Sequence, residues 1–394
     1  MNENEQIRPE GVIPEKGAEQ EPALKPVNGG KTPNARKKKK KKKKKMSVKK
    51  KILIIILIIL VIVGIGIGII FLIIHHYINL MNIKPVEESS YEIVDSVVDD
   101  DITDEPDSPQ EDIDDLENRI RENLEEKSDD IMADKDVLNV LLIGTDARSV
   151  SERGRSDSMI LVSINKKTKK VIMTSFLRDI YLAIPNIEST RLNHAYAYGG
   201  AHLLIDTLEE NFRIKIDRYA QVNFFSFCKT VDAVGGVEID VTQDEIYYIN
   251  NGLREINRLE GRAENTYQVT SAGRQTLNGA QALAYSRIRY IGTDFQRTQR
   301  QRTVLEQIIS KTKDMSLTEL DDLLEVVLPE ITTNMQESEI ISLLLDSNDI
   351  LDYERVQCRV PADGTWEFLT IRSMSVIGID FSANIQYLRD NIYG

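Results

Sequence analysis

An uninterrupted apolar segment near the N-terminus restricts what this chain can fold into more than any other feature. Residues 52–74 are aliphatic side chains, a phenylalanine and glycines, without a charge. As a helix the segment would be about 34 Å long, enough to cross the roughly 30 Å hydrocarbon layer of a bilayer. Arg36 and the lysines of 37–45 and 49–51 precede it, and positive flanks stay in the cytoplasm. We predict a single-pass signal anchor at 52–74 in the cell membrane, with residues 75–394 outside the cell.

A cleaved signal peptide and a nucleic-acid-binding tail are the alternatives for this region. A signal peptide has an apolar core of roughly 7–15 residues followed by small residues at its cleavage site, whereas His75, His76 and Tyr77 follow here. A lysine run can bind nucleic acid, but beside a membrane span it is explained by topology and by attraction to anionic lipid. We therefore expect residues 1–51 to be a disordered basic tail whose partner is membrane lipid and not nucleic acid.

Composition divides the rest of the chain into a linker and a large domain. Residues 75–136 are predicted to be an extracellular linker, because most of this segment is strongly acidic and its charges repel one another. Ile113, Leu116, Ile120 and Leu124 have the spacing of a short amphipathic helix within it. Residues 137–394 are sufficient for one large domain with its own core.

Hydrophobic patterns in this domain predict an α/β fold. The expected strands are 137–144, 158–165, 170–177, 355–361 and the VEIDV segment that follows Gly235-Gly236. The expected helices are 199–212, 223–234, 294–312, 317–328, 336–346 and the C-terminal segment. Asn278 should cap a further short helix, followed by a strand with Arg287 and Arg289. Strands and helices interleaved in this way predict a mixed sheet covered by helices on both faces, an α-β-α sandwich preceded by one transmembrane helix.

Arginines concentrate in residues 282–302, although the whole chain has a formal net charge of −13. In an extended segment Arg287 and Arg289 would project from the same face. On a helix beginning near residue 294, Arg297, Arg300 and Gln301 would share another face. Guanidinium groups pair bidentately with phosphate, and a helix N-terminus adds positive potential. The pattern favours an anion site, with a solvated basic helix face as the alternative.

Charged residues also lie at the ends of the predicted strands. Asp146 follows the first strand, Arg155 and Asp157 precede the second, and Arg178 follows the third. Loops at strand ends of α/β sheets line ligand crevices; local ion pairs such as Arg155–Asp157 are the alternative. The sequence contains no G-x-S-x-G, S-x-x-K or Walker motif, no Cys–His arrangement and no zinc-type histidine cluster. Aspartates with several arginines instead fit phosphoryl transfer assisted by a hard cation.

Several motifs, taken together and in this order, resemble those of the LytR-CpsA-Psr family. They are LLIGTDAR, RSDSMIL, SFLRDIYLAIP, LNHAYAYGG, VDAVGGVEIDV, LNGAQALAYSRIRY and DFQRTQRQ, and RVPADGTWEF fits the C-terminal part of the family. The resemblance implies a transferase that moves an anionic glycopolymer of teichoic acid or capsular type from polyprenyl pyrophosphate to a peptidoglycan hydroxyl. It implies Mg²⁺ as cofactor, with Mn²⁺ as a substitute, and it indicates no obligate protein partner.

Matching positions carry the family's site residues onto this chain. The resemblance implies that Asp146 and Asp157 bind the metal. It implies that the pyrophosphate is bound by Arg155, Arg178, Arg287, Arg289, Arg297, Arg300 and Gln301. The catalytic residues would be Arg155, Asp157, Arg178, Arg287 and Arg289. The apolar helices that follow the arginine-rich segments are expected to wall a groove for the polyprenyl chain, with ordinary core as the alternative. Residues 176–179 read FLRD where many relatives have a proline before the arginine.

Two other functions remain open at this stage. Water could replace the wall hydroxyl, which would make the protein a polyprenyl-pyrophosphate hydrolase. A membrane-bound transcriptional attenuator would need a cytoplasmic DNA-binding domain, and residues 1–51 contain no helix-turn-helix pattern.

Side-chain exposure at the site can also be predicted from these patterns. Asp157, as an exposed carboxylate at a strand end, is expected to contribute little to stability. Arg302, on a different helical face from Arg297, is expected to tolerate alanine. Cys228 and Cys358 lie outside any C-x-x-C motif, and free buried thiols are expected, with a disulfide between them as the alternative outside the cell.

Overall fold

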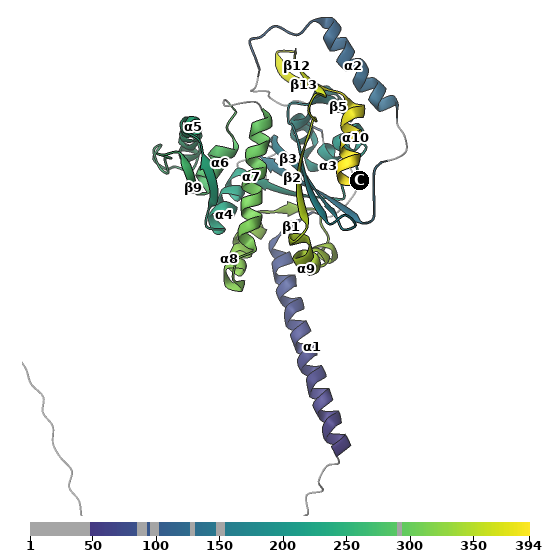
Figure 1. Ribbon diagram of the computed structural model, residues 1–394, viewed down its shortest axis with the longest axis vertical. Coiled ribbons are helices and arrows are strands. Elements are labelled where there is room, and N and C mark those ends of the chain that lie inside the picture. Colours follow the sequence, from purple (N-terminus) through teal and green to yellow (C-terminus); the bar gives the residue numbers. More distant parts are fainter. Residues whose placement is uncertain (1–47, 85–92, 95–101, 127–130, 147–153, 290–293) are drawn as a thin grey trace, which may run out of the picture. The chain divides into compact units, whose positions relative to one another are not determined.

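The structure is a computed structural model that describes residues 48–84, 93–94, 102–126, 131–146, 154–289 and 294–394 (Figure 1). The chain divides into two units, residues 1–63 and 64–394. Helix α1 (Val48–Leu80) includes one stretch, Ile59–Leu80, that is long and apolar enough to cross a membrane, with a mean hydropathy of 2.6. The predicted tail lies almost entirely outside the described residues.

A seven-stranded mixed sheet forms the centre of the folded unit. Its strand order is β1-β10-β7-β2-β3-β4-β11. The strands are β1 (Asn82–Ile83), β10 (Thr332–Thr333), β7 (Arg218–Asn223), β2 (Val137–Thr145), β3 (Ser156–Asn165), β4 (Lys170–Phe176) and β11 (Glu354–Val360). The meander β2-β3-β4 is antiparallel, whereas β7 runs parallel to β2 and β11 runs parallel to β4. Central strands buried on both faces explain why their sequences are nearly continuous apolar runs.

Helices cover both faces of this sheet (Figure 1). They are α2 (Gln110–Glu125), α3 (Leu192–Phe212), α4 (Phe224–Ala233), α5 (Gln243–Leu259), α6 (Gly279–Ser286), α7 (Asp294–Thr312), α8 (Leu317–Val327), α9 (Glu337–Leu351) and α10 (Phe381–Ile392), with a 3₁₀ turn at Leu328–Glu330. Three two-stranded sheets complete the unit: β5 (Tyr181–Ile184) with β6 (Ile187–Arg191), β8 (Val237–Val241) with β9 (Gly273–Leu277), and β12 (Trp366–Ile371) with β13 (Met374–Ile379). The predicted α-β-α class is confirmed.

Two separate hydrophobic cores lie in this unit. The larger core packs one face of the sheet, including Leu141 and Leu161, against α2, α3 and α10. The smaller core lies within α4, α5, α6, α7 and the β8–β9 hairpin. The helices of the smaller core are opposite the second face of the sheet, and the side chains of that face are not part of either core. This arrangement leaves room for a cavity between the sheet and the second helical group.

The predicted linker contains a helix that belongs to the domain. Leu116 and Ile120 of α2 are 0% and 3% exposed and are part of the larger core, and the hydroxyl of Tyr181 donates to Glu117 Oε1 at 2.9 Å. The predicted boundary at residues 136 and 137 is therefore too late. Acidic composition indicated a linker because the solvent-facing side of α2 is strongly charged, whereas only a narrow apolar face is buried.

The predicted strand with Arg287 and Arg289 is also wrong. Helix α6 continues to Ser286, and the N–H of Arg287 donates to the carbonyl of Leu283 at 3.1 Å. Asn278 caps this helix as predicted, accepting from the N–H of Gln281 at 2.9 Å. Gly279 is required next, because a Cβ there would lie 2.2 Å from the carbonyl oxygen of Cys228. Both arginines therefore follow a helix, with Arg287 in its C-terminal turn and Arg289 in irregular backbone.

Candidate active site

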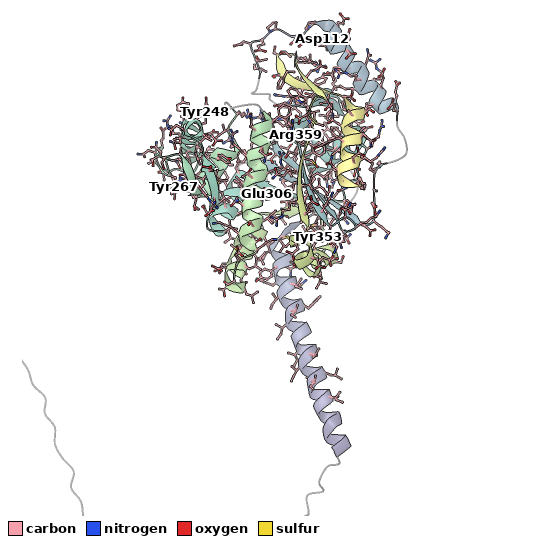
Figure 2. All side chains as sticks on the ribbon, in the orientation of Figure 1. Asp112, Tyr248, Tyr267, Glu306, Tyr353 and Arg359 are labelled. Carbon is pink, nitrogen blue, oxygen red and sulfur yellow. The ribbon has the colours of Figure 1, made fainter. Side chains whose placement is uncertain are left out.

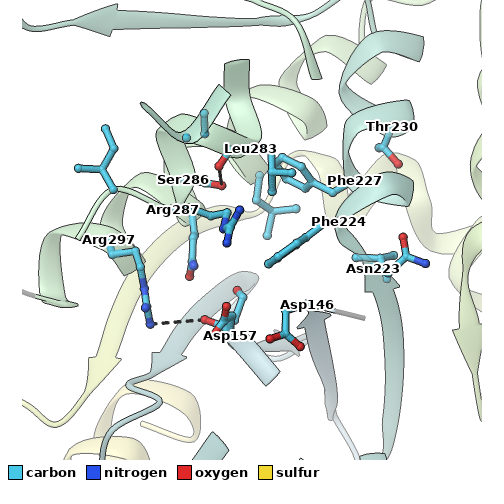
Figure 3. Close-up of a pocket in the computed structure, with 18 of the residues that line it drawn as sticks. Asp146, Asp157, Asn223, Phe224, Phe227, Thr230, Leu283, Ser286, Arg287 and Arg297 are labelled. Atoms are coloured by element: carbon cyan, nitrogen blue, oxygen red, sulfur yellow. Dashed lines mark hydrogen bonds between the residues drawn. The ribbon is translucent and has the colours of Figure 1, made fainter. Parts of the chain in front are cut away.

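A cavity of about 950 Å³ separates the second face of the sheet from α4, α5, α6 and α7 (Figure 3). Its floor contains Ile160 of β3, Leu142 of β2 and Ala220 of β7. Leu142 lies directly opposite each of the other two on the neighbouring strands. Helical side chains form the opposite wall, among them Phe224, Phe227, Leu283, Leu305 and Ile308. This apolar lining agrees with the groove expected after the arginine-rich segments.

One end of the cavity is polar because β2 ends and β3 begins there. Asp146 follows β2, and its Oδ1 accepts from the backbone N–H of Arg155 at 2.6 Å. Arg155 Nε lies 3.5 Å from Asp146 Oδ2. Both side chains line the cavity, as does Asp157 one residue into β3. Figure 3 shows the carboxylates of Asp146 and Asp157 beside each other at the cavity wall.

Asp157 joins the arginines that come from three other segments. Its Oδ1 accepts from Arg178 Nη1 at 2.9 Å and lies 3.8 Å from Arg289 Nη2. Arg297 Nη2 lies 3.5 Å from the backbone carbonyl oxygen of Asp157 (Figure 3). Burial would raise the pKa of Asp157, but the charges of Arg178, Arg297 and Arg289 outweigh burial and lower it below 3.8. Asp157 is therefore a carboxylate at neutral pH, and it has guanidinium partners from distant segments of the chain.

Arg297 enters the cavity from the first turn of α7. Its Nη2 lies 2.8 Å from Asp294 Oδ1, and its side chain is buried. Burial raises the pKa of Asp294, Arg297 opposes this, and nearby Asp179 adds to the increase. Among the described residues, Arg297 Nε and Gln301 Oε1 are buried without a hydrogen-bond partner. One helix turn therefore supplies two polar groups with unused hydrogen-bonding capacity at the cavity.

Arg287 and Arg289 complete this polar end. The guanidinium of Arg287 lies over the ring of Phe224 at 4.7 Å, and its Nη1 is 3.5 Å from Glu255 Oε2. Both arginines line the cavity although they are not on a strand. Arg287 thereby lies at the junction of the charged end and the aromatic wall (Figure 3).

Three predicted positions are placed differently from the expectation. Arg178 does not line the cavity; it is 4% exposed and lies behind Asp157. Arg300 is also outside the lining, and its Nε donates to Glu245 Oε1 of α5 at 2.9 Å. Arg302 is 3% exposed and donates to Ser175 Oγ at 2.7 Å. The description of Asp157 as an exposed carboxylate is therefore wrong, because its side chain is 14% exposed. The burial and the hydrogen bond of Arg302 are a physical argument against the expectation that it tolerates alanine.

Comparison with known proteins identifies the family. Residues 108–376, more than half of the chain, match the LytR_cpsA_psr family. The chain belongs to the LytR-CpsA-Psr family. Biofilm regulatory protein A of Streptococcus mutans is 37% identical over 238 residues, which cover 56% of this chain and 56% of that protein. The polyisoprenyl-teichoic acid–peptidoglycan teichoic acid transferase TagT of Bacillus subtilis is 33% identical over 229 residues, covering 57% of this chain and 68% of TagT.

A solved structure of this family has the same fold with a lipid present. It is the LytR-CPS2A-psr family protein YwtF (TagT) with bound octaprenyl pyrophosphate lipid. Its sequence is 27% identical, its TM-score is 0.50, and the match covers 67% of this chain and 94% of that one. The family match begins at residue 108, which agrees with the placement of α2 inside the domain.

Some residues of the site were not predicted from the sequence. Glu255 and Tyr248 line the cavity from α5, and Asp294 holds Arg297. Helix α5 is strongly amphipathic, so its polar face has the pattern of an ordinary solvent-exposed surface. In the sequence, Asp294 has the position of the first residue of a helix, which indicates no role in a site. A signal that could have identified it is its position three residues before Arg297, which is a favourable helical spacing for an ion pair.

The donor set is suited to a cation that also binds a phosphate. No group of three or more His, Cys, Asp or Glu side chains able to hold a metal occurs among the described residues. Asp146 and Asp157, however, line the same end of the cavity, and the lowered pKa keeps Asp157 ionised. Mg²⁺ commonly binds through one or two carboxylates together with substrate phosphates and water. Asp146 and Asp157 therefore fit a cation whose remaining ligands are phosphate oxygens and water.

Proposed function

We propose that this protein is a membrane-anchored phosphotransferase that moves a teichoic acid or capsular-type glycopolymer from polyprenyl pyrophosphate to a peptidoglycan hydroxyl. The observation that carries the proposal is a single cavity whose arginine- and aspartate-lined end continues into an apolar channel. A pyrophosphate with a long apolar tail has the same two-part chemistry. Support also comes from the relative named as a teichoic acid transferase and from the family structure with octaprenyl pyrophosphate.

Different groups of lining residues would contact different parts of the substrate. Arg155, Arg287, Arg289 and Arg297 would bind the pyrophosphate oxygens, and Gln301 lies one turn further along α7. Phe224, Leu283 and neighbouring apolar side chains would enclose the first isoprene units. The aromatic ring beneath Arg287 excludes water from one side of its guanidinium, which strengthens an electrostatic contact with phosphate.

In the proposed reaction, a sugar hydroxyl oxygen of the wall forms a bond to the phosphorus that bears the glycopolymer. The bond from this phosphorus to the bridging oxygen breaks, and polyprenyl phosphate leaves with that oxygen. Arginines already oriented toward the pyrophosphate stabilise the negative charge that develops there. The lowered pKa makes Asp157 a weak proton acceptor. Asp157 would instead orient the arginines, and the hydroxyl proton passes to another acidic group or to water.

Asp146 and Asp157 would hold Mg²⁺, or Mn²⁺ in its place, together with the pyrophosphate. A bound cation of this kind neutralises phosphate charge and orients the leaving group. Residues 1–51 would lie in the cytoplasm and the domain outside the cell, because the basic residues precede the apolar helix.

The arginine site can be tested by transfer of a lipid-linked glycopolymer to peptidoglycan. Arg289→Ala should lower the transfer rate by roughly 10²–10³ through loss of a contact to the developing charge. Arg289→Lys should recover only part of this, because an ammonium lacks the bidentate geometry. Arg289 is suitable because its side chain is 38% exposed, so its loss should leave the fold intact.

Arg258→Ala is the matched control. Its side chain is 72% exposed and pairs only at the surface with Glu264 at 3.5 Å, so activity should remain at the wild-type level. Equal activity of all four proteins would reject the arginine site. Release of the glycopolymer at the same rate with and without peptidoglycan would instead identify a hydrolase.

A further inference from the structure

An aromatic cluster lies next to the first turn of α7, outside the cavity. The ring centroids of Phe295 and Trp366 are 4.6 Å apart, and those of Trp366 and Phe368 are 4.9 Å apart. Trp366 and Phe368 are two positions apart on β12 and therefore project from one face of the hairpin. Phe368 is 54% exposed, and the other two rings are only partly buried. Phe295 and Trp366 pack against the larger core on one side, and the surface that each of the three rings keeps exposed is available for contact with a ligand.

The cluster lies near the polar end of the cavity, but on the side of α7 that faces away from the cavity. Phe295 and Arg297 are two residues apart on α7, so they project from nearly opposite sides of the helix. Arg297 lines the cavity, whereas Phe295 contacts Trp366 and lies 4.2 Å below the guanidinium of Arg359, which is labelled in Figure 2. The hairpin is also joined to the residue after Arg178, because the N–H of Ile377 donates to the carbonyl of Asp179 at 2.8 Å.

The direction of the reaction indicates what approaches from this side. In phosphoryl transfer the attacking and leaving oxygens lie roughly in line on opposite sides of phosphorus. If the polyprenyl phosphate leaves toward the apolar cavity, the attacking hydroxyl arrives from the opposite side. Phe295 and the β12–β13 hairpin lie beside Arg297, on the side of α7 that faces away from the cavity. We propose, resting on the function proposed above, that Phe295, Trp366 and Phe368 form a platform for sugar rings of the acceptor glycan chain.

The chemistry of the cluster suits a saccharide. An aromatic face carries negative charge and attracts the positively polarised C–H groups on one face of a pyranose ring. A charged pair lies beside the rings, because the guanidinium of Arg359 stacks on Phe295 and pairs with Asp363. Such groups hydrogen-bond the hydroxyls at a sugar's edge. A strand of the glycan chain held here would present a hydroxyl toward the phosphorus without entering the lipid cavity.

Trp366 is the single tryptophan of the chain, so intrinsic fluorescence reports directly on the platform. The full-length protein in detergent is titrated with soluble, donor-free peptidoglycan glycan fragments. We expect a saturable change of the tryptophan signal. Phe368→Ala should raise the dissociation constant, and the KM for peptidoglycan in transfer, by roughly five- to tenfold. The KM for the lipid-linked donor should be unchanged. Tyr267→Ala removes another exposed aromatic ring, 49% exposed and on the α5–β9 loop, and should match the wild type.

Each result has a defined meaning. Absence of a fluorescence change, or a wild-type KM for peptidoglycan in Phe368→Ala, would overturn the platform even if transfer occurs. A raised KM for the donor alone would assign the rings to the donor glycopolymer and also overturn the proposal. If the wild type fails to use the lipid-linked donor but still binds glycan fragments with a loss in Phe368→Ala, the platform stands and the proposed transfer reaction fails.

Discussion

The negative charge of Asp157 offsets the repulsion between the arginines that gather at the polar end of the cavity. Arg178, Arg289 and Arg297 approach one another from different segments, and guanidiniums gathered in this way repel. Arg178 is nearly inaccessible to water, so its charge needs a buried partner. A buried ion pair contributes little net stability, but removal of one member leaves an uncompensated charge. Asp157 therefore offsets part of the positive charge of Arg178, a task that it shares with Asp179.

Asp157→Asn should lower the free energy of unfolding by about 1–3 kcal/mol at pH 7, because Arg178 loses the nearer of two carboxylate partners, Asp157 at 2.9 Å, and keeps Asp179 at 3.4 Å. The pKa of Asp157 is lower in the folded protein than its ordinary value of 3.8. Its stabilising contribution is thus fully present above that value and is lost as the pH falls through the lower folded pKa. Urea unfolding of wild type and variant at pH 7 and pH 3 measures the difference, which should narrow in acid.

Asp352→Asn is the control for this titration. Asp352 is 89% exposed and lies 3.9 Å from Lys313, so its replacement should alter stability by no more than about 0.5 kcal/mol. A difference between wild type and Asp157→Asn that is the same at both pH values would contradict the assigned ionisation.

Residue spacing predicted which side chains gather here but not which of them face the cavity. Arg297 and Arg300 have the spacing of one helical face, yet Arg300 pairs with Glu245 on α5. Helix α7 is covered on more than one side, so neighbouring positions of its polar face have different partners. Arg302 shows the same effect on the side of the sheet, where Ser175 accepts its hydrogen bond. Such contacts depend on packing between elements that are distant in sequence, which local periodicity does not contain.

At the scale of elements, periodicity predicted most strands and helices, and the errors have physical causes. The apolar runs of β2, β3 and β4 were identified because these strands are buried. The VEIDV strand exists but pairs with β9 in a separate hairpin. The residues around Arg287 were misassigned because Ala282, Leu283 and Ala284 suit the short helix α6, whose C-terminal turn includes the arginine. The spacing of apolar residues predicted helix α2, but it did not predict that the helix packs into the larger core.

Leu116→Ala tests whether α2 is an integral part of the domain. The side chain is 0% exposed and packs in the larger core, so truncation should cost about 2–5 kcal/mol of unfolding free energy. Leu345→Ala on α9 is the matched control, because Leu345 is 76% exposed and should change stability by less than about 0.5 kcal/mol. Thermal unfolding compares the two variants. Equal unfolding midpoints for the two variants would show that α2 is part of the linker and not of the domain.

At the scale of the whole molecule, the apolar end of the cavity lies close to the point where the chain leaves α1. Val327 and Ile331 line the cavity. The N–H of Asn82, two residues after α1 ends, donates to the carbonyl of Ile331 at 3.0 Å, and β1 pairs with β10 in parallel. A lipid tail that extends past Ile331 would therefore emerge beside the end of the apolar helix. This placement is what a substrate anchored in the same bilayer requires.

The proposed topology predicts which parts of the protein a protease can reach. Intact protoplasts that carry the chain with distinct epitope tags at its two ends are treated with an impermeant protease. We expect loss of the C-terminal tag and survival of the N-terminal one, because the basic residues before Ile52 remain on the cytoplasmic side. After detergent lysis both tags should be lost, which controls for resistance of the folded domain. Protection of the C-terminal tag until lysis would place the arginine cavity in the cytoplasm, away from peptidoglycan, and the wall-transfer function would have to be abandoned.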